Sequence, residues 1–167
     1  DFVGSRGLGD VYKRQYKRYT HEGGVATPLI VHWPAGLKSQ GELRHTPSHI
    51  IDIAPTCLSA AGLLVKGMEG KSLLPVFVRD SKEERTLYWE HEGNRAVRKG
   101  NYKLVAMHDA PWELYDMNKD RSELNDLSKK MMGKAKELRL LYEAWAKRVG
   151  ALSWNEVMVT RKKKIKK

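Results

Sequence analysis

The stretch from residue 86 to residue 116 constrains the fold most, because it has the pattern of short β-strands joined by tight turns. The runs "TLYWEHEG", "RAVRKGNYKLVAM" and "WELYDM" are rich in strand-forming residues and have turn residues between them. Lys99-Gly100-Asn101 has the composition of a hairpin tip. Residues 102–107 alternate in two sets, which is the period of a sheet with one face covered. We therefore expect three or four antiparallel strands.

A helix is expected to follow the strands and to lay its apolar stripe across the sheet. Asp120, with Glu123 three residues later, resembles a capping box. Gly150 is expected to stop the helix. The apolar residues at helical spacing are Leu138, Leu141, Tyr142, Trp145 and Val149.

Upstream of the strands the pattern changes. Gly23-Gly24 marks a tight turn of the kind that uses positive φ. The apolar run "PLIVHWP" predicts a strand buried on both faces, the last one of a sheet begun upstream. "HIIDIAPTCLSAAGLL" predicts a helix with Pro55 in its first turn and Gly62 as its stop. "GMEGKSLLPVFV" is a turn followed by a short apolar element, open between helix and strand.

The formal net charge of +11 raises the question of nucleic-acid binding, since Lys and Arg that neutralise phosphates release counterions. Residues 161–167 carry +6, residues 1–15 add +1, and residues 16–160 retain only +4. A terminal run of like charges is typical of a solvated, disordered tail. The aromatic stacking pattern of single-strand binders is absent, because Trp89 and Trp112 are placed like core residues.

Composition and length bound the remaining possibilities. The 167 residues, 41% of them hydrophobic, are enough for one domain or slightly more. No run of eighteen apolar residues and no signal-peptide order is present, so we expect no segment of this sequence to span or address a membrane. Cys57 is the sole cysteine, which excludes an intrachain disulfide and a Cys-based zinc site. We expect it to be a small core residue.

Two polar clusters are candidates for chemistry. In "YKRYTHEGG", Lys17, His21 and Glu22 combine a cation, an imidazole and a carboxylate beside a glycine turn, a set that can bind an anion. Solvated loop side chains are the alternative. In "EHEGNR", metal binding is conceivable, but adjacent strand residues point to opposite faces, so at most Glu90 and Glu92 converge.

The first residues have no apolar period and no cap. "SRGLGDVYKRQ", Ser5 to Gln15, resembles the conceptual translation of a sequencing-library adapter. We therefore expect residues 1–15 to be artefactual or disordered, and the authentic sequence to start near Tyr16 as part of something longer. An ordinary flexible N-terminal arm is the alternative.

Four ordered motifs resemble a known family. They are "YTHEGGVATPLIVHWPAG", "HIIDIAPTCLSAAGL", "LYWEHEGNRAVRKGNYKLV" and "WELYDMNKDRSELNDL". Together they closely resemble the C-terminal part of the formylglycine-dependent sulfatases, especially bacterial arylsulfatases, from Tyr16 to about Leu152. The resemblance implies an α/β (α+β) fragment: residues 16–80 end an alkaline-phosphatase-like α/β domain, residues 81–152 form an antiparallel sheet packed against a helix, and residues 153–167 are a basic tail.

The resemblance also implies an activity and its cofactors. The family hydrolyses sulfate esters with a formylglycine made from Cys or Ser in a Cys/Ser-x-Pro/Ala-x-Arg motif, near a calcium ion held by Asp and Asn. Cys57 is followed by Leu-Ser-Ala-Ala and lacks the Arg of that motif. We expect the formylglycine and the calcium ligands to lie in the full-length parent. The fragment alone is therefore expected to be inactive and to contain no metal-binding residue.

The resemblance assigns roles to individual residues. Lys17 lies five positions before Glu22, where the family has a catalytic lysine that contacts the sulfate. His21 is expected to line the pocket or orient Lys17, with a hydrogen-bonded loop histidine as the alternative. Glu22 is expected to tie down backbone amides around the two glycines. His91 and Asn94 resemble positions that face the cleft and touch the organic part of the substrate.

Partners and location follow from the same resemblance. The substrate of the parent is expected to be a small-molecule or glycan sulfate ester, with no nucleic acid and no membrane as partner. The parent is expected to be periplasmic or secreted. The alternative function is a basic binding module for nucleic acid or sulfated polysaccharide, which would use the sheet and the lysine-rich tail. The sequence favours the sulfatase.

Overall fold

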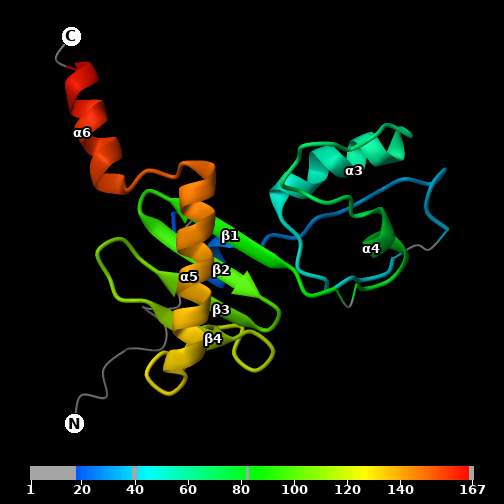
Figure 1. Cartoon of the computed structure of the whole chain (residues 1–167). Helices are drawn as coiled ribbons and strands as arrows, with labels where there is room; N and C mark the ends of the chain where they lie inside the picture. Colours follow the sequence, from blue (N-terminus) through cyan, green and yellow to red (C-terminus); the bar gives the residue numbers. More distant parts are fainter. Residues whose placement is uncertain (1–17, 39–40, 82, 166–167) are drawn as a thin grey trace. The chain divides into compact units, whose positions relative to one another are not determined.

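The computed structural model describes residues 18–38, 41–81 and 83–165, and Figure 1 draws their helices and strands. The chain divides into two compact units. One unit contains the described residues up to Thr27 and those from Thr86 onward, and the other runs from Pro28 to Arg85. No helix in the described ranges combines the length and the apolar character needed to cross a membrane.

The first unit is built on an antiparallel sheet of four strands in chain order, which confirms the predicted antiparallel strands. Glu92 and Gly93 join the first two strands, both with positive φ (51° and 84°), as hairpin turns that match the twist of their strands require. Gly100-Asn101 joins the next two, which confirms the predicted hairpin tip. The strands are β1 Thr86–His91, β2 Asn94–Lys99, β3 Tyr102–Ala106 and β4 Glu113–Asp116.

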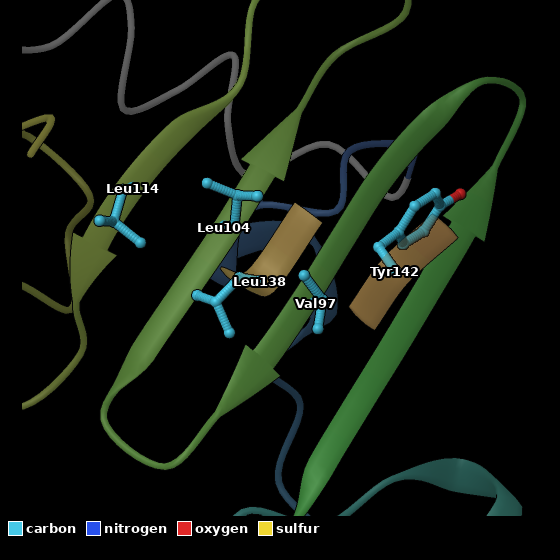
Figure 2. Packing of buried hydrophobic residues seen from close by; sticks show 5 residues of the cluster. All are labelled: Val97, Leu104, Leu114, Leu138 and Tyr142. Carbon is cyan, nitrogen blue, oxygen red and sulfur yellow. The ribbon is translucent and has the colours of Figure 1, made fainter. Parts of the chain in front are cut away.

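The helix α5, Met132–Val149, covers one face of the sheet, as predicted. Leu138 and Tyr142 are one helical turn apart and enter the core together. Burying one such side chain contributes about 1.5–3 kcal/mol. The helix ends at Gly150, whose φ of 69° places it in the left-handed region of a C-cap. Figure 2 shows the buried cluster of Val97, Leu104, Leu114, Leu138 and Tyr142.

The opposite face of the sheet is also covered, so the prediction of a single covered face is wrong. Its buried apolar residues are Ala96, Val105, Tyr115 and Met117, with Trp89 packed against them. Lys103 projects from the same face of β3 as Val105 and is 0% exposed. The alternation predicts that Lys103 and Val105 face water. Both are buried, because Val105 is apolar and Lys103 pairs with carboxylates in the interior.

The predicted capping box at Asp120 and Glu123 is wrong. The Asp120 carboxylate accepts hydrogen bonds from the backbone N–H of Leu124 (3.0 Å) and Asn125 (2.7 Å), which closes a loop rather than a helix terminus. Glu123 has a φ of 56°, which is incompatible with the first turn of a helix. The helix α5 begins only at Met132.

The basic terminus was expected to be a disordered tail, but the structure places a helix, α6, over Trp154–Ile165. Ser153 caps it. The Ser153 Oγ accepts from the N–H of Glu156 (3.4 Å), and the Glu156 carboxylate accepts from the N–H of Ser153 (2.8 Å). This is a capping box, a local signal strong enough to start a helix despite the like charges that follow.

In the described residues of the second unit there are three short helical elements. The predicted helix is confirmed as α3, Ile53–Ala60, preceded by the 3-10 turn η1, Ile50–Asp52. Gly62, with a φ of 72°, follows its end as predicted. The element left open between helix and strand is the helix α4, Leu74–Val78.

Asp52 joins the parts of the second unit. Its carboxylate is fully buried and accepts two hydrogen bonds from the Arg85 guanidinium, both 2.6 Å long. It also accepts from the backbone N–H of Lys71 (2.9 Å) and of His49 (2.8 Å). Burial alone would raise the pKa of the Asp52 carboxyl, but these bonds together lower the pKa below its usual value. The ionised carboxylate therefore holds three chain segments.

Two predictions for the second unit are wrong. "PLIVHWP", residues 28–34, forms no strand in the described structure, and Ile30 is 89% exposed. A strand buried on both faces requires paired neighbours, and none of the described strands pairs with this segment. Cys57, expected in the core, lies on an exposed position of α3.

Candidate functional site

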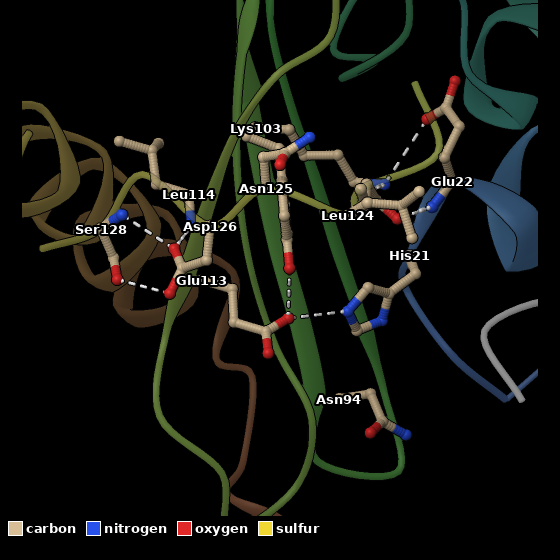
Figure 3. A network of polar contacts seen from close by, with 12 residues as sticks. His21, Glu22, Asn94, Lys103, Glu113, Leu114, Leu124, Asn125, Asp126 and Ser128 are labelled. Carbon is tan, nitrogen blue, oxygen red and sulfur yellow. Dashed lines mark hydrogen bonds and ion pairs between the residues drawn. The ribbon is translucent and has the colours of Figure 1, made fainter. Parts of the chain in front are cut away.

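The candidate site lies where residues 18–25 meet the face of the sheet opposite α5 (Figure 3). Glu22–Val25 forms one helical turn, α2, closed by the N–H groups of Gly24 and Val25, which donate to the His21 carbonyl (2.9 and 3.1 Å). Neither Gly23 nor Gly24 has a positive φ. The predicted turn is present, but the glycines serve a helical turn and not a left-handed one.

Glu22 is held at both its backbone and its side chain. Its N–H donates to the Glu123 carboxylate (2.7 Å). Its own carboxylate accepts from the Arg121 guanidinium (3.0 Å) and lies 3.5 Å from the Lys103 ammonium. The prediction that the Glu22 carboxylate ties down backbone amides is therefore wrong. The Glu123 carboxylate accepts from the amide of Glu22, while the Glu22 carboxylate pairs with cations.

Lys103 is the centre of this network. Its Nζ lies 2.9 Å from Glu123 Oε1 and 5.9 Å from the centre of the Trp89 ring. The contact with Glu123 lacks aligned hydrogen-bond geometry, so it is an electrostatic contact between opposite charges. Both side chains are at most 2% exposed. In such surroundings a charge is tolerated only when it is paired.

His21 is anchored one residue before Glu22. Its Nε2 lies 3.2 Å from Glu113 Oε2, and the Tyr115 hydroxyl donates to the same carboxylate oxygen (2.9 Å). The His21 side chain is buried, and its Nδ1 has no hydrogen-bond partner within the described part of the chain. The contact with the Glu113 carboxylate fixes the orientation of the imidazole through Nε2.

Asn94 is a third anchor. Its amide nitrogen donates to the backbone carbonyls of Arg18 (2.9 Å) and His91 (3.1 Å). Its amide oxygen accepts from the N–H of His108 (3.1 Å). The side chain is only 6% exposed and is fully engaged in joining the segment before α2 to two loops.

The predicted site residues are only partly brought together. Lys17 lies outside the described residues. His21 and Asn94, both labelled in Figure 3, are buried, whereas His91 is exposed at the end of β1. Their roles toward a substrate stay predictions. Glu92 pairs with Arg18 (2.5 Å).

Sequence reasoning missed Lys103, Glu113 and Glu123. Lys103 sits between Tyr102 and Leu104 in a strand, where a lysine is ordinarily solvated. Its burial depends on carboxylates that come from positions 22 and 123, and nothing local reports those contacts. The sequence contains one weak indication that Lys103 is buried, which is that it lies on the same strand face as Val105.

The described residues do not fit a calcium or formylglycine centre. No group of three or more His, Cys, Asp or Glu side chains within those residues is arranged to hold a metal ion. Cys57 is exposed and lacks the motif from which formylglycine is made. In the second unit, an apolar groove between α3, α4 and residues 29–33 includes Cys57, and its lining offers no charged group for catalysis.

Comparison with known proteins identifies the family. The family model for the C-terminal region of N-sulphoglucosamine sulphohydrolase matches residues 12–147, and the chain belongs to this family. An uncharacterized sulfatase of Schizosaccharomyces pombe is 32% identical over 151 residues, which cover 78% of this chain and 27% of that protein. An N-acetylglucosamine-6-O-sulfatase of Bacteroides thetaiotaomicron is 31% identical over 160 residues, covering 85% of this chain and 27% of that protein.

Solved structures agree on the fold. A protein from a study of glycosaminoglycan metabolism in Bacteroides thetaiotaomicron superimposes with a TM-score of 0.64 at 22% identity, over 77% of this chain and 30% of that chain. A 2-O glycosaminoglycan sulfatase superimposes with a TM-score of 0.54 at 29% identity, over 70% and 28%. The expected α/β (α+β) sulfatase fragment is confirmed. The chain spans about a quarter of the length of the curated relatives described above.

Proposed function

We propose that this chain is the C-terminal part of a sulfatase that hydrolyses sulfate esters. The match of residues 12–147 to a sulphohydrolase family carries this proposal. The nucleophile and the calcium ligands then belong to the part of the parent that precedes Tyr16. In this division, residues 16–80 end the catalytic α/β domain and residues 81–152 form the C-terminal subdomain.

Lys17 is the catalytic residue that this chain contributes. The bond from sulfur to the bridging oxygen breaks during hydrolysis, and negative charge grows on that oxygen as the alcohol departs. An ammonium group held beside the oxygen stabilises the charge more in the transition state than in the ground state. The position of Lys17, five residues before Glu22, supports this role.

The other predicted residues take different roles. The burial of His21 and the engagement of both amide atoms of Asn94 favour positioning of the segment that follows Lys17 over direct contact with substrate. His91 is exposed and is the candidate for contact with the organic part of the substrate. A relative named for a sulfated amino sugar supports a sulfated sugar as that organic part. Action outside the cytoplasm stays a prediction for the parent.

The first test is the contiguous upstream sequence. We expect an Asp-Asn pair shortly before Tyr16 and a Cys/Ser-x-Pro/Ala-x-Arg motif farther upstream. A start codon directly before the codon of Tyr16, with neither motif upstream, would exclude sulfatase activity for the parent and favour a basic binding module.

The second test is Lys17→Ala in the full-length enzyme. Turnover of a chromogenic aryl sulfate and of a 6-sulfated amino sugar is expected to fall on the order of a hundredfold, the loss typical of removing one charge-stabilising group. Lys130→Ala, at an exposed lysine before α5, is the matched control and should leave turnover unchanged. Unchanged turnover in Lys17→Ala would remove Lys17 from the mechanism.

A further inference from the structure

Residues 18–25 are fastened to the sheet at three successive points, one from each of three neighbouring strands. Asn94 of β2 holds the carbonyl of Arg18, Glu113 of β4 holds the imidazole of His21, and Lys103 of β3 pairs with the carboxylate of Glu22. All three side chains project from the sheet face opposite α5. Figure 3 shows the contacts of Glu113 with His21 and of Lys103 with Glu22, and labels Asn94 nearby.

The contact at Glu22 differs from the other two because it uses buried charges. Lys103 and Glu123 are both withdrawn from water and compensate one another at 2.9 Å. A buried ion pair is rarely more stabilising than a well-packed apolar pair of the same shape. The ion pair instead restricts the positions of the side chains around it, because each buried charge must stay close to an opposite charge. The backbone N–H of Glu22 completes the arrangement by donating to Glu123.

The fastened segment directly follows Lys17 in the sequence. The first held atom, the Arg18 carbonyl, belongs to the next residue, and Glu22 is five residues away. Few rotatable backbone bonds therefore separate the anchors from Lys17. A catalytic group displaced by about 1 Å can cost roughly a hundredfold in rate, so the anchors bear on catalysis without touching substrate.

We propose that Lys103 and Glu123 are positioning residues, which fix residues 18–25 on the sheet and thereby set the place of Lys17. The catalytic half of this inference rests on the proposed sulfatase function. The structural half concerns only the attachment of residues 18–25 and is measured without activity.

The test uses the full-length enzyme with both charges replaced together, as Lys103→Met with Glu123→Met. Removing the pair as a whole avoids leaving one buried charge without a partner and preserves the packed volume. A second double variant, Lys103→Met with Glu123→Gln, restores a carbonyl that can accept from the N–H of Glu22. The control is Lys99→Met with Glu137→Gln, an ion pair (3.1 Å) between β2 and α5, on the other face of the sheet.

The structural readout is hydrogen exchange of the amides of Glu22–Val25. The Met/Met variant is expected to accelerate their exchange at least about tenfold while the amides of α5 keep their protection. The Met/Gln variant should recover part of the protection, and the control should change none of it. Unchanged exchange at Glu22–Val25 in the Met/Met variant would overturn the anchoring, and loss of protection throughout α5 would reveal a role in global stability alone.

The catalytic readout is a double-mutant cycle with Lys17→Ala. The Met/Met variant is expected to lower kcat about tenfold or more when Lys17 is present, and to have less than about a twofold effect in the Lys17→Ala background. Equal losses in both backgrounds would overturn positioning through Lys17. If Lys17→Ala alone leaves kcat intact, the proposed role of Lys17 fails, while the exchange experiment still decides the anchoring.

Discussion

At the scale of single residues, Asp52 carries the largest expected effect on stability. Asp52→Ala leaves the Arg85 guanidinium, whose side chain is 15% exposed, without its carboxylate. Breaking a buried pair from one side costs about 3–5 kcal/mol. Urea unfolding, monitored through hydrogen exchange of the α3 amides, should show this loss of unfolding free energy.

The matched control for Asp52 is the neighbouring surface pair. Lys71 and Glu83 form an ion pair in which both side chains are more than half exposed. Solvent screens such a pair, so Glu83→Gln should change the unfolding midpoint of α3 very little. A comparable loss in both variants would mean that the burial of Asp52 is not what makes its ion pair important.

Some residues of the candidate site can be predicted from neighbouring sequence, and others depend on contacts with residues far away in the sequence. His21 and Asn94 could be selected from the sequence, because they sit in recognisable motifs. Lys103 and Glu123 could not, because their importance comes from a contact between side chains twenty residues apart that also includes Glu22. A lysine and a glutamate in polar company are normally assigned to the surface.

At the scale of elements, one glycine inside α5 and one at its C-cap give opposite predictions. Gly150 has a φ of 69° at the C-cap, where a side chain is strained although space is open. Gly133 lies within the helix at an ordinary φ, with nothing within 4 Å of an added Cβ. Gly150→Ala should therefore lower the free energy of unfolding by about 1 kcal/mol. Gly133→Ala should raise it by about 0.4–1 kcal/mol.

Thermal unfolding monitored by circular dichroism checks this pair, since the two changes should shift Tm in opposite directions. The comparison is internal, because both variants add the same methyl group to the same helix. A stabilising Gly150→Ala would indicate that the chain leaves α5 without the left-handed turn.

The elements predicted correctly are those whose signals are local. Hairpin turns and helical periodicity lie within twenty residues, and so β1 to β4 and α5 could be found from the sequence. The apolar content of "PLIVHWP" predicts a strand, but a strand forms only with a pairing partner, and none of the described strands pairs with this segment. The helix α6 was missed because the charge run outweighed the Ser153 and Glu156 cap that starts it.

At the scale of the molecule, the first unit is a sheet with two differently covered faces. The face under α5 is apolar and supplies the stabilising core. The opposite face combines a smaller apolar cluster with the charges that hold residues 18–25. The core that stabilises this unit and the charged groups that attach residues 18–25 therefore lie on opposite faces of the same sheet. Replacements in one cluster can be separated experimentally from replacements in the other.

The stability of the protein should fall in acid, because each unit contains a carboxylate that accepts several hydrogen bonds in its ionised form. Asp126 accepts from the N–H groups of Leu114 (2.9 Å) and Ser128 (2.8 Å) in the first unit, as Asp52 does from its partners in the second. Burial would raise the pKa of Asp126, yet these bonds lower the pKa below its usual value, as they do for Asp52. The unfolded carboxyls, with pKa values of about 3.9, therefore take up protons first as the pH falls.

The sign of the pH dependence follows. The stabilisation is complete above the unfolded pKa and is lost as the pH falls through the folded pKa, so Tm should decline between about pH 5 and pH 2. Asp126→Asn should lower Tm at pH 7 and flatten the decline, because the amide no longer titrates. Tm measured across this range for both proteins provides the test. Parallel curves would show that Asp126 carries no part of the acid sensitivity, and would shift the explanation to Asp52.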